Sequence, residues 1–250
     1  MMLDEVRPIT IQEARDLVQK YHYSKVFPRI TKLALGGFKD GKLVASATLG
    51  FGTRPMHTIQ KIFPSLTTAD YLELGKLCVA DEMPKNTESF FIARIIDYLK
   101  KEYPHLKVFF SWADGIIGKP GYIYQASNFY YGGFIWTEMY LGPDGNRVHV
   151  RSIQGHPDLP KATGSSLKTR AYAEIEKLGY KKYFGLQFRY IYPLCNKKDW
   201  KRLQAESPFQ WNRGGYPKAD TCMWKRQTGK GTRESCGMPL NIKTEYIKKG

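Results

Sequence analysis

The feature that most limits the fold of this chain is a nearly continuous apolar run from Leu106 to Trp112. A strand that is apolar on both faces has to be covered on both sides, as central strands are between two layers of helices. Amphipathic helical patterns precede and follow this run, at about 87–101 and 166–178. The chain is therefore expected to form an α/β fold in which helices cover a sheet.

The other patterns describe how that sheet is built. Residues 3–9 predict a short strand, and Thr10 and Glu13 form a capping box that opens a helix. Asp40-Gly41 joins two strand patterns and is typical of a tight hairpin. The other segments expected are strands at 30–38, 42–51, 71–80, 134–141, 147–153 and 182–194, a loop at 52–69 and a short helical piece at 122–131. This order favours a mixed α/β sheet over a doubly wound parallel one.

Composition excludes several classes of protein. Hydrophobic residues make up 42% of the chain and aromatic residues 14%, which is enough for a packed core and argues against disorder. No signal-peptide pattern opens the sequence and no stretch approaches the length of a membrane span, so we expect a cytoplasmic protein without membrane association. Cys78 is expected in the core. The late cysteines Cys195, Cys222 and Cys236 lack CxxC spacing, and a zinc site among them stays open.

Charge is distributed unevenly along the chain. The formal net charge is +16, and residues 151–250 hold 21 Lys and Arg against 8 Asp and Glu, which leaves 18 and 15 for the first 150 residues. Such asymmetry favours a polyanionic partner, most often a nucleic acid, over the alternative of a basic surface kept for solubility. Cations interleaved with aromatic rings suit a polynucleotide backbone. The predicted DNA-binding residues are Lys181, Lys182, Arg189, Lys197, Lys198, Lys201, Arg202, Lys225 and Arg226.

Several motifs in series resemble known families. Residues 124–134 resemble the A-x-x-x-Y…G-F segment of the GNAT fold, the architecture of N-acetyltransferases. Five further blocks resemble the Mom family of phages: Tyr21–Ser24, Leu74–Leu77 leading to Pro84–Ser89, Ser111–Asp114, Gly121–Asn128 and Phe188–Tyr190. This resemblance implies a GNAT-like transferase that carbamoylmethylates the N6 amino group of adenine in duplex DNA and so protects phage DNA from restriction. Such an enzyme is expected to flip its target base.

The same resemblance implies a domain plan and partners. A GNAT-like catalytic domain is expected over 1–195, with a hairpin and helix inserted at about 141–180, and a basic, DNA-contacting extension over 196–250. Double-stranded DNA is the expected partner, and a homodimer stays open. Two alternatives are an acyltransferase acting on a protein or small amine, and a non-catalytic DNA-binding protein on a degenerate GNAT fold.

Five residues are candidates for the reaction itself: Asp114, Tyr124, His22, Tyr23 and Ser89. Asp114 directly follows the buried strand, where ligands of open α/β sheets bind, and can accept a hydrogen bond or a proton from the adenine amine. Alternatively, it is a turn residue before Gly115. Tyr124 lies where GNAT enzymes often carry a tyrosine that protonates the departing thiolate, or it simply packs with other rings. His22 and Tyr23 lie in a region that borders the acceptor site in GNAT folds, and a metal-ligand role of His22 stays open.

The start of the helix at Thr87 is the candidate cofactor site, because unpaired N–H groups and the helix dipole suit a phosphate there. GNAT enzymes hold the pyrophosphate of coenzyme A at this place with a glycine-rich turn, and this chain lacks those glycines. An acyl-CoA or related donor therefore stays open, as does a metal, and the alternative is a helix cap alone. The predicted cofactor-binding residues are Lys76, where the Mom pattern usually has arginine, together with Lys85, Asn86, Thr87, Ser89 and Asn128.

Overall fold

The structure is a computed structural model that describes residues 2–52, 55–148, 153, 173–229 and 231–239. The chain divides into two compact units, each assembled from segments that are distant in sequence. Unit 1 comprises Met1–Trp112, Tyr122–Gly133 and Arg189–Tyr216. Unit 2 comprises Ala113–Gly121, Phe134–Phe188 and Pro217–Gly250. The expected division at residue 195 concerns function and stays a prediction.

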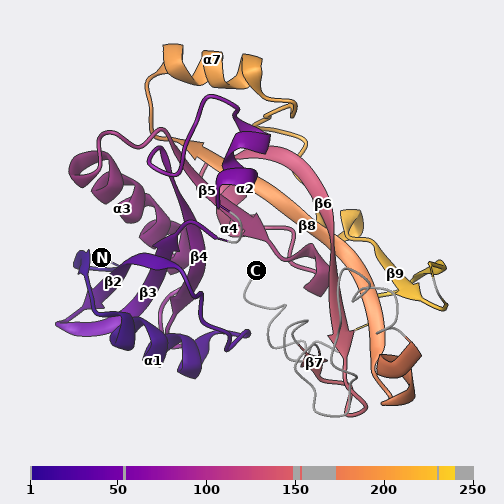
Figure 1. The fold of residues 1–250 in the computed structure, drawn as a ribbon. Coiled ribbons are helices and arrows are strands. Elements are labelled where there is room, and N and C mark those ends of the chain that lie inside the picture. The colour runs from indigo at the N-terminus through magenta and orange to yellow at the C-terminus, as the bar shows by residue number, and fades with distance from the viewer. Residues whose placement is uncertain (1, 53–54, 149–152, 154–172, 230, 240–250) are drawn as a thin grey trace. The chain divides into compact units, whose positions relative to one another are not determined.

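Unit 1 is built on a mixed sheet (Figure 1). Its strands follow the order β1-β2-β3-β4-β5-β8-β6. Strands β1 to β4 pair antiparallel with one another, whereas β4 and β5 pair in parallel. The sheet is therefore mixed, which confirms the predicted mixed α/β class. The strands are β1 (Glu5–Pro8), β2 (Thr31–Lys39), β3 (Lys42–Gly50), β4 (Tyr71–Val79), β5 (Val108–Ala113), the start of β6 (Tyr130–Leu141) and the end of β8 (Lys181–Pro193).

Local sequence signals explain the elements that were predicted correctly. Thr10 and Glu13 make both bonds of the capping box at the start of α1 (Ile11–Tyr21). Asp40 and Gly41 have φ of 48° and 72°, as the predicted β2–β3 hairpin requires. The long helix α3 (Thr87–Glu102) lies where its pattern places it, whereas α4 (Tyr122–Ala126) covers only the first half of the segment expected at 122–131, whose last two residues belong to β6.

Two helices of unit 1 were not predicted. The loop expected over 52–69 is wrong, because α2 (Pro55–Ile62) lies within it and buries Ile59 and Ile62. Pro55 suits the first helical position, where a missing N–H costs no hydrogen bond. Helix α7 (Lys197–Glu206) begins at Asn196, whose side chain accepts the Asp199 N–H at 2.9 Å.

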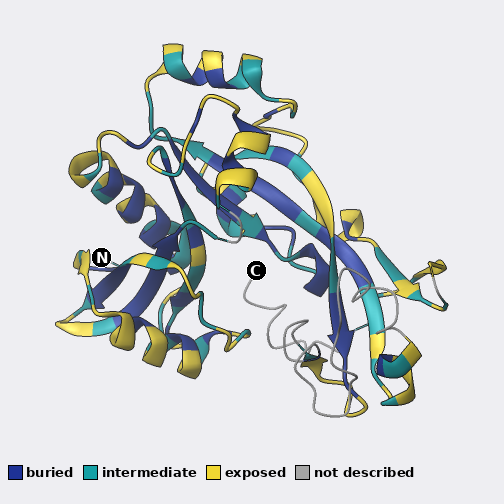
Figure 2. Cartoon of the chain, in the orientation of Figure 1, coloured by how far each residue is buried: buried dark blue, intermediate teal, exposed yellow. Residues whose placement is uncertain are grey.

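The two unpredicted helices belong to an aromatic core in unit 1. Tyr71, Phe63, Trp200 and Trp211 are buried together there with apolar residues of β5 and β8. Figure 2 shows the corresponding alternation of buried and exposed faces along the helices. Burial of one large apolar side chain stabilises a fold by about 1.5–3 kcal/mol, so these rings contribute much of what holds α7 to the sheet.

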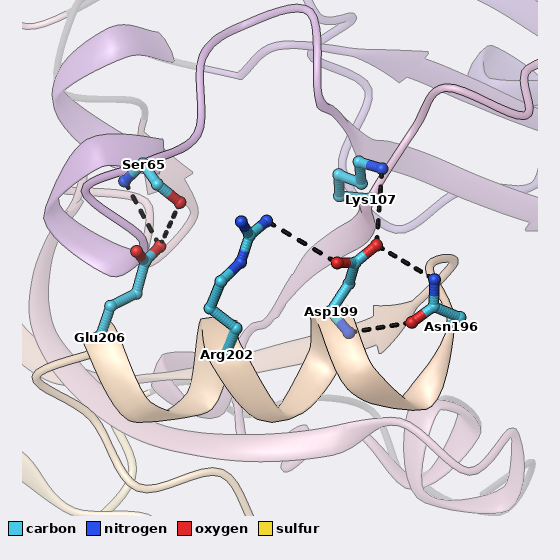
Figure 3. A network of polar contacts seen from close by, with 6 residues as sticks. All are labelled: Ser65, Lys107, Asn196, Asp199, Arg202 and Glu206. Carbon is cyan, nitrogen blue, oxygen red and sulfur yellow. Dashed lines mark hydrogen bonds and ion pairs between the residues drawn. The ribbon is translucent and has the colours of Figure 1, made fainter.

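Polar contacts also hold α7 in unit 1 (Figure 3). Glu206 accepts hydrogen bonds from the N–H and hydroxyl of Ser65, at 3.3 and 2.6 Å. Asp199 lies 3.8 Å from both Lys107 and Arg202. Glu206 and Asp199 therefore contact Ser65 and Lys107 outside the helix, whereas Lys197, Lys198 and Lys201 are exposed on it.

Unit 2 has its own strands and its own core. It contains the rest of β6 and β8, which pair with β7 (Arg147–Val148) and β9 (Trp224–Gln227) respectively, and β10 (Arg233–Cys236), which pairs with β9. Ile116 of the 3-10 turn η1 (Gly115–Ile117) packs with Met139, and Trp224 donates to the Ile116 carbonyl at 2.8 Å. A second short turn, η3, spans Ala219–Thr221.

Two predicted elements of unit 2 lie partly outside the described residues. In the strand expected at 147–153, residues 149–152 lie outside them. In the helix expected at 166–178, residues 166–172 lie outside them, whereas 173–177 are helical. Gly179 follows with a φ of 80°, which confirms its predicted place at the helix end.

Candidate functional site

A pocket of about 420 Å³ lies at the start of α3 in unit 1. Three of the predicted cofactor residues, Asn86, Ser89 and Asn128, line it together. They come from the loop before α3, from its first turn and from the end of α4. Residues about 40 positions apart in sequence are thus brought to one site, although nothing in their spacing pairs them.

Asn86 gives this pocket an unusual backbone. Its φ of 72° is left-handed, and it has no side-chain capping bond. A left-handed residue followed by a helical one can turn successive N–H groups toward one side, as in anion-binding nests, but the Thr87 N–H here already donates to the Pro84 carbonyl at 3.2 Å. Asparagine tolerates this conformation better than other non-glycine residues. Asn86 therefore supplies the backbone freedom for which the absent glycines were expected to be needed.

The neighbouring side chains have separate roles. Thr87 is fully buried and its hydroxyl donates to the Pro84 carbonyl at 2.7 Å, so this side chain shapes the loop rather than lining the pocket. The Ser89 hydroxyl donates to the Asn86 carbonyl at 3.0 Å. Lys85 is exposed beside them, and Asp97, which also lines the pocket, lies 3.9 Å from Arg94.

Tyr124 lies inside unit 1, with 7% of its surface exposed. Its ring packs on Phe129 and Tyr190, with centroids 5.4 and 5.2 Å away. The Ser111 and Tyr124 hydroxyls are hydrogen-bonded at 2.8 Å, and the Ser111 oxygen also lies 3.3 Å from the Leu74 carbonyl oxygen. The Tyr124 side chain is therefore packed among other rings and also held by a hydrogen bond to Ser111. Its role as a proton donor stays a prediction.

His22, Tyr23 and Lys76 form a second cluster in unit 1, which we call the acceptor cluster. The His22 and Tyr23 rings are stacked with centroids 4.3 Å apart, and Lys76 Nζ lies 5.9 Å from the Tyr23 centroid. His22 Nδ1 lies 2.9 Å from the Ser24 nitrogen and 3.0 Å from the Ser24 carbonyl oxygen, so it accepts from the N–H in one neutral tautomer and donates to the carbonyl in the other. In the described part of the chain, no group of three or more His, Cys, Asp or Glu residues could hold a metal ion.

A β-bulge places Lys76 in this cluster. Thr48 pairs with Lys76 and Leu49 pairs with Leu74, so Gly75 is the extra residue of β4. A methyl group at Gly75 would lie 3.1 Å from Pro28 Cγ, which shows that the segment after α1 lies against the bulge. The acceptor cluster therefore joins the end of α1 to the middle of β4.

Glu73 is a titratable group that the sequence pattern did not assign to the site. Burial raises the pKa of its carboxyl to about 7. A methyl group at Gly52 would come within 2.1 Å of Glu73 Oε2, and Gly52 has a φ of 66°, so only glycine fits opposite this carboxyl. The signal available in the sequence was a lone carboxylate in an otherwise apolar strand.

Replacing Glu73 by glutamine is expected to flatten the pH dependence of stability. The carboxyl ionises near 4.5 in its ordinary state and near 7 when folded, so between these values the folded chain holds a proton that the unfolded chain has released. The free energy of unfolding should therefore fall as pH rises from 4.5 to 7, by about 3 kcal/mol in total, and Glu73→Gln should abolish this fall. Urea unfolding at pH 5 and 7.5 measures it. The exposed Glu102→Gln is the matched control, and an equal fall in both variants contradicts the assignment.

Asp114 belongs to unit 2, whereas the other four predicted reaction residues belong to unit 1. Its carboxylate lies 3.6 Å from Arg147, and 21% of its side chain is exposed. The turn that follows is closed by the Asp114 carbonyl, which accepts the N–H groups of Ile117 and Lys119, while the side chain makes no capping bond. The carboxylate is thus not needed to close the turn, which favours a role other than that of a turn residue.

Some of the predicted DNA-binding cations are exposed to solvent, whereas others are buried, ion-paired or packed on an aromatic ring. Arg189 is a correction: it is 4% exposed, donates to the Gly132 carbonyl and lies 3.8 Å from the Phe209 centroid, so it is a core residue of unit 1. Lys182 is ion-paired with Glu138 at 2.6 Å, and Lys225 lies 4.9 Å from the Trp136 centroid. The fully exposed members are Lys181, Lys197, Lys198, Lys201, Arg202 and Arg226. Their contact with DNA stays a prediction.

Other predictions concern cysteines and membranes. Cys78 is 4% exposed, and burial raises the pKa of its thiol to about 12, as expected of a core residue rather than a nucleophile. Cys222 is buried as well, and burial raises the pKa of its thiol to about 11. Among the helices of the described residues, none combines the length and apolar character that crossing a membrane requires.

The fold is a mixed α/β sheet with a pocket at the start of α3. Residues 4–218 match the Mom protein family, and the chain belongs to that family. Over 124 residues it is 32% identical to the methylcarbamoylase mom of Escherichia phage Mu. That alignment covers 50% of this chain and 51% of the relative, so the chain spans about half the length of the curated relative it matches.

Solved structures of acetyltransferases are also similar. An N-acetyltransferase from Staphylococcus aureus Mu50 is 15% identical with a TM-score of 0.41, over 77% of this chain and 98% of that one. The aminoglycoside 6'-N-acetyltransferase from Enterococcus faecium is 12% identical with a TM-score of 0.35, over 78% and 99% of the two chains. Scores this low support no argument about activity.

Proposed function

We propose that this protein is a transferase that modifies the N6 amino group of adenine in duplex DNA by carbamoylmethylation, which protects phage DNA from restriction. The observation that carries the proposal is the family match over residues 4–218. The name of the phage Mu relative, a methylcarbamoylase, supports the type of group transferred. The strongly basic composition of the chain supports DNA as the substrate.

In this proposal the pocket at the start of α3 holds the donor. Backbone N–H groups at the start of α3 bind a phosphate of the donor, and the side chains of Ser89 and Asn128 orient it. A donor bound there would supply the carbon to which adenine N6 forms its new bond, while the bond from that carbon to the departing group breaks. Tyr124, held by Ser111, donates a proton to the departing group.

The acceptor cluster is proposed to receive the base. N6 of a paired adenine lies inside the duplex, so the base has to leave the stack before it can react. Tyr23 is 38% exposed and offers a ring face on which a flipped base can stack. The attacking amine loses a proton as the N–C bond forms, and a general base has to accept that proton; the assignment of this role to Asp114 rests on the sequence and stays a prediction.

Mass spectrometry of nucleosides tests the proposal. DNA from cells that express the full chain is digested, and an adenine nucleoside of increased mass is expected, with the added mass of a carbamoylmethyl group. The exposed-surface variant Lys42→Gln should give the same yield, whereas Asn86→Val, which cannot adopt the left-handed turn without strain, should lose most of it. Unmodified adenine in the presence of folded, abundant protein contradicts the proposal and favours a non-catalytic DNA-binding protein.

A further inference from the structure

A second pocket of unit 1, of about 330 Å³, lies between the first turns of α1 and the segment that leads into β2. Neither the donor pocket nor the acceptor cluster contains the residues that line it. The lining residues are Ile11, Arg15, Phe27, Pro28, Arg29 and Thr31. Two of the six are arginines and none is acidic, so the pocket favours an anion.

Both arginines are available to a ligand. In the described part of the chain, no carboxylate forms an ion pair with Arg15 or Arg29. The nearby Asp16 accepts a hydrogen bond from Gln12 at 2.7 Å instead. Both guanidiniums are exposed to solvent at the mouth of the pocket.

The pocket also holds these cations in place. The Arg15 guanidinium carbon lies 4.9 Å from the Phe27 centroid, which limits the directions in which its donors point. The Thr31 hydroxyl donates to the Pro28 carbonyl at 3.2 Å and closes the short segment that carries Arg29. A planar guanidinium in a restricted orientation can bind a phosphate through two parallel hydrogen bonds.

The surroundings favour a phosphate that belongs to a polymer. Ile11, Val26 and Ile30 are 38%, 52% and 45% exposed beside the arginines and offer apolar contact to sugars and bases. Pro28, which lines the pocket, also contacts the β4 bulge next to Lys76. Residues 22–31 therefore contribute to both places: His22 and Tyr23 belong to the acceptor cluster, and Phe27, Pro28, Arg29 and Thr31 line the pocket.

We propose that Arg15 and Arg29 bind a backbone phosphate of the DNA strand that carries the target adenine. A phosphate held here positions the neighbouring nucleotide at His22, Tyr23 and Lys76 without reading its sequence. The inference rests on the proposed function in naming DNA as the substrate. It adds a DNA contact in the N-terminal part of unit 1, outside the basic C-terminal third.

The salt dependence of DNA binding tests this inference. Binding of the full chain to a fluorescent 20-base-pair duplex is measured by anisotropy across a series of KCl concentrations. A lost phosphate contact lowers the slope of log K against log salt by about 0.9, so Arg15→Gln/Arg29→Gln, which removes the one phosphate contact that the two arginines share, should lower the slope by about 0.9 and weaken binding roughly 8-fold at 0.1 M salt. The charge-matched control Lys42→Gln/Lys101→Gln, at two exposed lysines, should leave the slope unchanged. The variant Arg15→Lys/Arg29→Lys keeps both charges and should retain most of the slope of the unchanged protein.

Four other outcomes are decisive. A slope equal to that of the control double variant overturns the inference. A loss of coenzyme A affinity in the double glutamine variant, with the DNA slope unchanged, assigns the pocket to the donor and overturns it too. If the adenine adduct forms while the slope does not respond, the proposed function stands and this inference fails. If the slope responds in a protein that makes no adduct, the phosphate site stands and the proposed function fails.

Discussion

Asp114→Ala should lower the yield of modified adenine by at least about a hundredfold and leave DNA affinity within about threefold of that of the unchanged protein. A positioned group that takes part in proton transfer contributes about 10²–10⁴ to a rate, which is the loss expected when its carboxylate is removed. The structure favours such a role because backbone groups close the turn after β5, so the Asp114 side chain is not needed there. Nucleoside mass spectrometry measures the yield, and anisotropy measures the affinity.

Arg147→Ala is the matched control for this prediction. It removes the ion pair of 3.6 Å and leaves the carboxylate in place, so the yield should fall much less than in Asp114→Ala. Thermal unfolding of both variants separates chemistry from folding. If adduct and DNA binding vanish together in Asp114→Ala, or if the two variants lose activity equally, Asp114 acts through structure and its assignment to the reaction is wrong.

Elements with strong local signals were predictable, and elements held by a few distant contacts were not. Helix α1 carries its capping box within four residues, and the β2–β3 hairpin carries its own turn dipeptide. Helix α2 buries only Ile59 and Ile62, and α7 buries only Trp200 and Leu203. Two apolar residues in a polar segment give too weak a period to distinguish a helix from a loop. Their helical form depends on the shared aromatic core, which no local pattern reveals.

The sequence predicted which residues belong to the candidate site better than it predicted how they are arranged in space. The order of the family-like motifs predicted Asn86, Ser89 and Asn128 as site residues, and these three line one pocket in the structure. The left-handed backbone of Asn86 was not predicted, because only glycines were expected to allow such a turn. Asparagine also adopts this conformation readily. The Arg15 and Arg29 pocket was also not foreseen, because the two arginines lie on different segments and only the packing of Phe27 and Pro28 joins them.

The number of basic residues in a segment predicts DNA contacts less well than the exposure of each basic side chain does. Counting cations in the C-terminal third treats Arg189, Lys182 and Lys201 as equivalent, but these side chains are respectively buried, ion-paired and exposed. A buried cation contributes packing and hydrogen bonds, and a paired one contributes little net field. Each basic residue therefore has to be placed before it is assigned to DNA, and Arg189 offers the clearest test of that distinction.

Arg189→Ala should lower the free energy of unfolding by about 3 kcal/mol. The change empties the space between Phe209 and Trp112, with their centroids 3.8 and 5.3 Å from the guanidinium carbon, and leaves the buried Gly132 carbonyl without this donor. Cavity formation and an unsatisfied buried acceptor each cost on the order of 1–3 kcal/mol. Arg189→Met should recover part of the loss, because its chain refills the space between the rings. Urea unfolding of the three proteins measures the differences.

The same variants separate a core cation from a DNA contact. Arg189→Met should leave the salt slope of DNA binding unchanged, since a side chain that is 4% exposed does not reach a phosphate. Lys201→Gln, an exposed cation on α7, should lower the slope by about 0.9 with little change in stability. If instead the slope falls in Arg189→Met and the protein stays as stable as before, Arg189 belongs to the DNA surface after all. Such a result would require this side chain to leave the Gly132 carbonyl and both rings when DNA binds.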